Sequence, residues 1–349
     1  MKLTSGEIYF IGEYDLKSGE RTEYVKVGIV RHGGKDERSS LDRLLEHQTG
    51  NPRRLEIIHA ITTNAVEGIE TNLHHSFSMH RVYGEWLKLD NALIEQVKAR
   101  AEELRDQMES LRPLYEKAEE LKKSPSTEEK IPSDGVSEHW YLLYQKAKVK
   151  MDACEEAIDA YKSLRIKEKE EGKAVDEFIG VQVRAGRRYF DEKAFKEANP
   201  DIYAKFVTVE TSKEPKGSFR LSKPKDMDLS LVDIDPALGK LLEEFTAEIE
   251  KPEGARKESE LHNLFLYVNS ALAFAEWEQD VATVQIKVLC GTAEGISGIC
   301  SWKRAHTTTE VFDDKALKDQ FPELVEQFTR ETESTKAYSL ETKSAYKDE

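Results

Sequence analysis

Residues 70–89 read ETNLHHSFSMHRVYGEWLKL, and two patterns in this stretch guide the prediction of the fold. The first is E-x-x-L-H-x-x-F. Together with Val66 and Ile69 before it, its apolar residues recur every three or four positions, which indicates one face of a helix. The second is R-x-x-G-E-W-L-x-L, whose last five residues, 85–89, have the character of a short strand. The sequence therefore predicts a helix that is followed closely by a strand.

The residues upstream complete a compact α/β unit that ends near residue 90. Three segments are short, β-rich and bounded by polar turns, and we predict them to be strands: 8–14, 24–30 and 55–61. The first two form an antiparallel hairpin. Two amphipathic helices follow the second and third strands, and we expect Ser40 and Asn64 to cap them.

Taken together and in this order, these segments resemble the GIY-YIG nuclease superfamily. The hairpin carries Tyr9 and then Lys26-Val27-Gly28, which is typical of the branch that has K-[IV]-G where other members have YIG. Arg43 precedes the turn H-Q-T-G-N-P, and both patterns of residues 70–89 match as well. The resemblance covers residues 5–90. It implies a DNA endonuclease that hydrolyses phosphodiester bonds with the help of Mg²⁺ or Mn²⁺.

The resemblance also implies roles for individual side chains. Glu70 would bind the metal, Tyr9 would steady or deprotonate the attacking water, and Arg43 would contact the scissile phosphate. Lys26 stands where the family has a second tyrosine. It could act electrostatically or as a base, or Tyr24 on the same strand face could replace it.

Each of these residues also has an ordinary structural interpretation. Glu70 could be a solvated helix carboxylate like Glu67, Tyr9 a strand aromatic, and Arg43 one half of a surface ion pair. His74 is either part of the site or a packed, hydrogen-bonded helix residue. The other histidines of this region, including His47, are interpreted as surface or turn residues.

Composition limits the remaining possibilities. The chain has 349 residues, which favours two or three domains, and its net charge is −15. No apolar run approaches the ~18 residues of a membrane span, and no signal peptide is visible at the N-terminus. The three cysteines form no C-x-x-C pair, which indicates a reducing cytosol. We therefore expect a cytoplasmic protein with no membrane partner.

Residues 1–90 hold 12 Lys/Arg and 14 Asp/Glu, so this region is slightly acidic as a whole. A positive DNA-binding groove would therefore have to come from a local cluster of basic residues. A set of basic residues near the predicted catalytic side chains could contact phosphates. We predict substrate contacts from Tyr24, Arg31, Arg38, Arg53 and Arg54, and Lys35 lies among them.

Beyond residue 90 the sequence predicts a helical connector at 91–123, which Pro113 should kink or interrupt. Residues 124–136 are rich in Pro, Ser and charge, and they predict a flexible linker. Two copies of one unit follow, at 137–225 and 259–342, joined by a connector at 226–258 with a helix of its own.

The repeat is clearest in FDEKAFKE at 190–197, which returns as FDDKALKD at 312–319, an offset of 122. Each copy should form a long helix, a strand, a short helix and a strand. The acids that open each short helix, including Asp191 and Asp313, are predicted to cap it. Two small basic clusters, at 184–188 and 302–304, could touch phosphate or guard a strand edge.

This unit resembles the C-terminal tail of YqaJ-like viral recombination exonucleases, without their catalytic core. The resemblance implies a phage or mobile-element setting and modules that recognise DNA or a protein partner. The sequence as a whole therefore predicts an α+β protein: a small nuclease domain at 1–90, a helical connector, and two tandem modules of a long helix with a small sheet. The alternative function is a DNA- or protein-interaction protein that reuses the nuclease fold without cutting.

Overall fold

The computed structural model of the chain describes residues 3–33, 38–83, 85–223 and 235–342, and it is α+β, as predicted. A five-stranded antiparallel sheet organises the N-terminal part, in the order β3-β1-β2-β5-β4. Its strands are β1 (Gly6–Tyr14), β2 (Arg21–Arg31), β3 (Arg54–Thr63), β4 (Arg81–Tyr83) and β5 (Trp86–Lys88). The hairpin and the third strand lie where the sequence predicted them. Gly84 of the strand motif and Lys35 lie outside the described residues.

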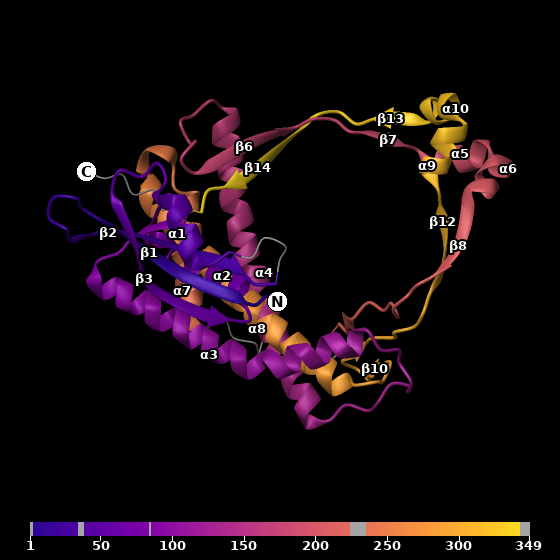
Figure 1. Ribbon diagram of the computed structural model, residues 1–349, viewed down its shortest axis with the longest axis horizontal. Helices are drawn as coiled ribbons and strands as arrows, with labels where there is room; N and C mark the ends of the chain where they lie inside the picture. Colours follow the sequence, from indigo (N-terminus) through magenta and orange to yellow (C-terminus); the bar gives the residue numbers. More distant parts are fainter. Residues whose placement is uncertain (1–2, 34–37, 84, 224–234, 343–349) are drawn as a thin grey trace.

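The two faces of this sheet have different covers (Figure 1). Alternation along β1 directs Ile8 and Phe10 to one face, where they pack with helices α2 (Val66–Ser76) and α3 (Asn91–Lys122). Tyr9 and Ile11 face the other side and pack with Leu44 of α1 (Ser40–Gln48). The candidate catalytic tyrosine therefore lies under α1.

Three local predictions about helices were wrong. The first helix is capped by Ser39, whose side chain accepts a hydrogen bond from the amide of Asp42. The second begins after Ala65 with no side-chain cap, because the Asn64 side chain binds Glu109 of α3 instead. Helix α3 also runs uninterrupted through Pro113.

Three further helices form the body of the molecule beside this domain. The long helices α4 (Gly135–Glu170) and α8 (Glu258–Cys290) run antiparallel, because Arg165 near the end of α4 pairs with Glu258 at the start of α8. Helix α7 (Pro236–Glu250) packs against both through Phe245. Both long helices match the predicted start of each repeat copy. No helix in the described ranges is long and apolar enough to cross a membrane.

The two repeat copies intertwine, since most strands of one copy pair with a strand of the other. The antiparallel pairs are β6 (Ile179–Arg184) with β14 (Thr335–Leu340), β7 (Arg188–Phe190) with β13 (Thr329–Glu331), β8 (Val207–Thr211) with β12 (Thr308–Phe312), and β9 (Arg220–Leu221) with β11 (Cys300–Ser301). The short strand β10 (Gly295–Ile296) extends the last pair within the second copy.

The pairing has an internal two-fold symmetry. Phe190 lies opposite Thr329, and Phe312 lies opposite Val207. These two pairs exchange positions when the 122-residue offset is applied. The prediction of two tandem modules, each with its own small sheet, is therefore corrected. A single strand leaves its backbone donors and acceptors unpaired, and here the other copy supplies the partner.

The short helices of both copies pack together in a small unit that we call the knob. It contains α5 (Glu192–Ala198), α6 (Pro200–Tyr203), α9 (Asp314–Gln320) and α10 (Pro322–Gln327), around Phe195 and Leu317. Asp191 and Asp313 accept hydrogen bonds from the amides of Ala194 and Ala316, as the capping prediction required.

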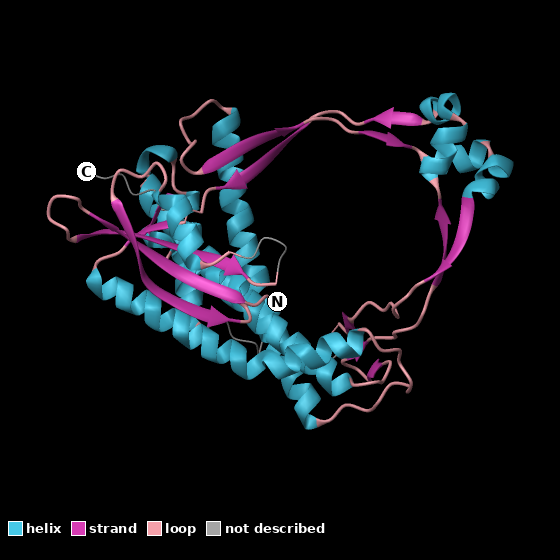
Figure 2. Cartoon of the chain, viewed as in Figure 1, coloured by secondary structure: helices cyan, strands magenta, loops and turns pink. Residues whose placement is uncertain are grey.

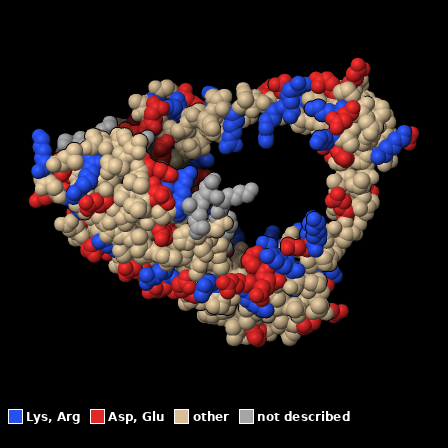
Figure 3. Space-filling model, viewed as in Figure 1, with Lys and Arg blue, Asp and Glu red and all other residues tan. Residues whose placement is uncertain are grey.

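The knob is held away from the body by two ribbons, so that the chain forms a ring (Figures 1 and 2). We call residues 179–190 with 329–340 the first arm, and residues 207–221 with 300–312 the second arm. Each arm contains one segment from each repeat copy. The opening remains when all atoms are drawn (Figure 3).

Residues 124–136, predicted to be a flexible linker, are hydrogen-bonded along the segment that follows α8. The amide of Ser126 donates to the carbonyl of Arg304 at 2.8 Å, and the amide of Ile131 donates to Gly295 at 3.1 Å. Ile131 also packs against buried residues of the same region. These hydrogen bonds hold backbone groups that a free linker would leave unpaired.

Limited digestion is accordingly expected to spare residues 124–131 and to begin in the arms, at 184–188 or 212–218. Two-stranded ribbons with both faces exposed are marginally stable, so their strands open to proteases more often. Mass spectrometry of the first fragments from a broad-specificity protease checks this result. Early cuts between 124 and 131 would contradict it.

Candidate active site

Tyr9 forms the centre of the candidate site, on the α1 side of the sheet. Its side chain is only 1% exposed, and it lies opposite Gly28 of β2. A Cβ atom at Gly28 would lie 2.5 Å from the phenolic oxygen of Tyr9. Glycine is therefore needed at this position because the tyrosine ring occupies the space of a side chain.

Helix α1 brings Arg43 and His47 to the Tyr9 hydroxyl. The two residues are four positions apart, so they share one face of the helix. His47 Nε2 lies 3.4 Å from the Tyr9 oxygen, and the Arg43 guanidinium is hydrogen-bonded to Tyr9 as well as to Glu46. Sequence reasoning interpreted His47 as a turn residue and missed this contact. Its spacing from Arg43 was the signal that could have found it.

The protonation states around Tyr9 follow from burial. Burial raises the pKa of Tyr9 above its ordinary value, and the hydrogen bond from Arg43 offsets only part of that effect. Burial lowers the pKa of His47, and the nearby charges of Lys26 and Arg43 lower it further. At neutral pH the site therefore holds a neutral phenol beside a neutral imidazole, which can accept a proton from it.

Lys26 lies on the same face of β2, two residues before Gly28, and is 7% exposed. Its ammonium group forms an ion pair with Glu85. Burial alone would raise the pKa of Glu85, but the hydrogen bond and charge of Lys26 outweigh it, and the net shift is downward. Tyr24 instead lines an open hollow of about 340 Å³ with Arg53 and Trp86. Lys26 and Tyr24 were the two candidates for the role of the family's second tyrosine. Among the described residues, Lys26 contacts another ionisable group of the site, Glu85, and Tyr24 does not.

Glu70 lies on α2, within electrostatic reach of Glu85 and Lys26. Within residues 3–33, 38–83, 85–223 and 235–342, no group donates a hydrogen bond to its carboxylate or forms an ion pair with it. Burial, and then the charge of Glu85, raise the pKa of Glu70 to about 7, although Arg31 and Lys26 oppose this shift. In the described part of the chain, this half-buried carboxylate therefore has no direct ion-pair partner.

A consequence for stability follows from the raised pKa of Glu70. A carboxyl group whose pKa is about 7 in the folded state and 4.5 otherwise destabilises the fold progressively as the pH rises between those values. In EDTA, Glu70→Gln should therefore be more stable than wild type at pH 8, by about 1–2 kcal/mol after allowance for partial exposure. At pH 4 the two proteins should be nearly equal. Urea denaturation at both pH values checks this result, and a gain that is the same at both would contradict it.

His74, predicted either to act in the site or to be packed, is half-buried and bonded to the main chain. Its Nε2 lies 3.2 Å from the carbonyl oxygen of Val27, so this nitrogen carries the proton and donates. Burial lowers the pKa of His74 to about 4, and the ring is neutral. Strand β5 is short and, within the described ranges, does not pair with the carbonyl of Val27. His74 donates a hydrogen bond to this carbonyl and so connects α2 to β2.

The arginines predicted to contact phosphates are all paired with carboxylates. Their ion pairs are Arg31–Glu67 at 2.7 Å, Arg38–Glu46 at 2.9 Å, Arg53–Glu13 at 2.6 Å and Arg54–Glu56 at 3.1 Å. Exposed pairs of this kind contribute only ~0–1 kcal/mol, so a phosphate could displace the carboxylate. The domain nevertheless presents no preformed row of unpaired arginines at these positions.

A metal at this site would depend on Glu70. No group of three or more His, Cys, Asp or Glu side chains gathers around a common point in the described part of the chain. Zinc sites of the usual kind need such a group. A single carboxylate that keeps several waters on the ion suits Mg²⁺ or Mn²⁺, and the desolvated, unpaired carboxylate of Glu70 fits that requirement.

The chain matches no family model, no curated protein and no solved structure. Function is therefore inferred from the side chains around Tyr9 and Glu70.

Proposed function

We propose that the N-terminal domain is a divalent-metal-dependent DNA endonuclease that hydrolyses phosphodiester bonds. The observation that carries this proposal is Glu70, a half-buried carboxylate with a pKa of about 7 and no cationic partner within the described residues. Retaining such a group costs stability, and strain of this kind is concentrated at functional sites. Tyr9, Arg43 and Lys26 supply the other groups that the chemistry needs.

Hydrolysis requires a water to lose a proton as its oxygen attacks phosphorus. The Tyr9 hydroxyl can accept that proton while it passes its own to His47 Nε2, 3.4 Å away. This relay needs no free phenolate, which burial disfavours. The imidazolium that forms would later return the proton to the leaving oxygen or to solvent.

Two cations would stabilise the negative charge that develops on phosphate. Arg43 can exchange its exposed partner Glu46 for phosphate oxygens through its planar guanidinium. Lys26 contributes a fixed positive charge that Glu85 orients. Bound at Glu70, Mg²⁺ or Mn²⁺ would supply Lewis-acid stabilisation of the same charge.

Tyr9→Phe should lower the cleavage rate about 10²–10⁴-fold, because it removes only the proton-relaying oxygen. The ring would still fill the space above Gly28, so the melting temperature should change little. Tyr14→Phe, on the same strand and outside the site, is the matched control and should cleave like wild type. Equal rates for Tyr9→Phe and Tyr14→Phe would contradict the relay.

A second candidate is a protein that binds DNA or another protein without cutting. The net charge of −15 and the ion-paired arginines favour it. A supercoiled-plasmid nicking assay with Mg²⁺ or Mn²⁺, and with EDTA as control, separates the two. Nicking that EDTA abolishes supports the nuclease, and binding without nicking under every divalent ion supports the alternative.

A further inference from the structure

The ring formed by the body, the two arms and the knob has an unusual distribution of charge. The first arm contains five Lys/Arg and two Asp/Glu, and the second arm contains five Lys/Arg and three Asp/Glu. The arms are thus net positive, at +5 together, in a chain whose net charge is −15. Figure 3 shows Lys and Arg side chains projecting into the opening from the first arm.

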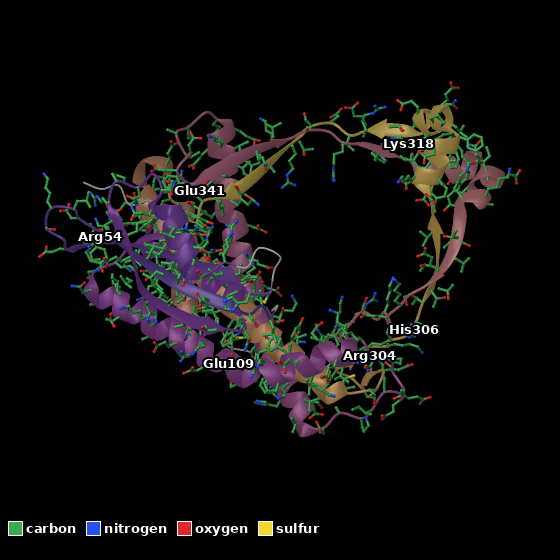
Figure 4. The ribbon with its side chains drawn as sticks, in the orientation of Figure 1. Arg54, Glu109, Arg304, His306, Lys318 and Glu341 are labelled. Atoms are coloured by element: carbon green, nitrogen blue, oxygen red, sulfur yellow. The ribbon has the colours of Figure 1, made fainter. Side chains whose placement is uncertain are left out.

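Most of these cations are unpaired, in contrast to the arginines around the candidate active site. Six of them are exposed and have no carboxylate within ion-pair distance in the described ranges: Arg184, Arg187 and Lys336 in the first arm, and Lys213, Lys216 and Arg220 in the second. When unpaired Lys and Arg side chains neutralise phosphates, the counterions condensed on the nucleic acid are released. This release is the main source of affinity for nucleic acids. Figure 4 places Arg54 on the far side of the body from the opening.

The arms are also exposed in a way that an isolated protein rarely tolerates. Beyond its base each arm is a two-stranded ribbon, and Val183 and Val209 in these parts are 67% and 69% exposed. Such ribbons contribute little stability of their own. The base of the second arm instead packs on the body, where Trp302 is buried. The knob joins the two arms at their far ends (Figure 1). A polymer that passes through would cover these surfaces and meet cations on two sides.

We propose that the ring encircles DNA, with the unpaired cations of both arms against its phosphates. The opening passes through the molecule from face to face. A linear polymer such as DNA can thread through it, whereas a globular partner cannot. The proposal deepens the proposed function by naming how the substrate is held, and it rests on that function for the choice of DNA. Encirclement is tested under conditions without cleavage, so the encirclement proposal and the nuclease proposal can fail independently.

The test uses full-length protein in EDTA and DNA anchored to a bead at one end, as a duplex and as a single strand in parallel. After loading, the free end is either capped with a bound antibody or left open, and the beads are washed in ~1 M salt, where the Debye length is ~3 Å. Protein should stay on capped DNA and leave open DNA. Retention on either form supports encirclement and shows whether duplex or single-stranded DNA passes through the ring. Equal loss from capped and open DNA of both forms overturns it.

Opening the ring gives an independent check. Protease sites are inserted in both strands of the first arm, at 185–187 and at 332–334. A cut in one strand leaves the other repeat copy to close the ring, so retention on capped DNA should persist. Cuts in both strands should release the protein. Retention after both cuts would overturn encirclement.

The role of the cations is tested by the salt dependence of binding. Each lost phosphate contact lowers the slope of log K against log salt by ~0.9 on duplex or ~0.7 on single strands, so three losses should lower it by about 2–3. The arm variant combines Arg184→Gln, Arg187→Gln and Lys336→Gln. The matched control combines three ion-paired residues of α3, α4 and α7: Lys117→Gln, Lys148→Gln and Lys240→Gln. Equal slopes for the two variants would overturn the assignment of the phosphate contacts to the arms.

Discussion

Glu70→Ala should lower metal-dependent cleavage about 10³-fold or more, because a bound divalent ion is worth several kcal/mol of transition-state stabilisation. The fold should be retained, since the lost carboxylate makes no hydrogen bond or ion pair within the part of the chain that the structure describes. Initial rates of plasmid nicking, in Mg²⁺ and in Mn²⁺, measure the effect. Circular dichroism and the melting temperature verify the fold.

The control for this variant must be an exposed carboxylate outside the site. Glu67, one turn earlier on α2, is unsuitable: it pairs with Arg31 and accepts a hydrogen bond from Thr4, so the sequence-based view of it as a solvated carboxylate was wrong. Glu95 on α3 is exposed and pairs only with Lys98 among the described residues. Glu95→Ala should cleave like wild type. If Glu70→Ala cleaves as fast as Glu95→Ala, the nuclease proposal fails.

Arg165→Ala should be the most destabilising single substitution in the body, at about 3–5 kcal/mol. The Arg165 side chain is fully buried, with its guanidinium 2.7 Å from Glu168 and 2.6 Å from Glu258. The second contact is an ion pair whose angle is unsuited to a hydrogen bond. The guanidinium also stacks over Phe178, 4.4 Å from the ring centre. Its loss would leave Glu168 with Arg256 alone and would open a cavity.

A surface pair provides the comparison for Arg165. Lys148 and Asp152 form an i,i+4 pair on α4 with about half of each side chain exposed, and Lys148→Ala should cost no more than ~0.5 kcal/mol. Thermal and urea denaturation of both variants measure the difference. Because Phe178 precedes β6, Arg165→Ala should also loosen the base of the first arm and speed its proteolysis. Similar stability of the two variants would contradict the structural role of Arg165.

Short-range patterns allowed many of the elements to be predicted. The hairpin, both long repeat helices and the caps at Asp191 and Asp313 depend on residues within a few positions of one another, and they lie where expected. The cap at Ser40 was wrong because the adjacent Ser39 takes that position. At the second helix, Asn64 found a distant partner in Glu109 instead.

The candidate site was predicted in part. Tyr9 lies within electrostatic reach of Arg43 and Glu70, and Glu70 within reach of Lys26, while their roles stay predictions. The spacing of His47 from Arg43 indicated a shared helix face, but the contact of that face with Tyr9 and most carboxylate partners of the basic residues came from the structure. The contacts Tyr9–His47, Arg38–Glu46 and Arg53–Glu13 join residues from 8 to 40 positions apart, so they depend on how the strands and helices pack.

The recurrence of near-identical residues at a fixed offset of 122 was enough to predict two equivalent units. Their exchange of strands, and the opening that they enclose, became visible in the three-dimensional structure. A strand is satisfied equally well by a partner from its own copy or from the other, because backbone hydrogen bonds do not depend on side-chain identity. Here Ile179 at the start of β6 and Leu340 at the end of β14 pack together against the end of α4. The partner that lies nearest to β6 therefore belongs to the other copy.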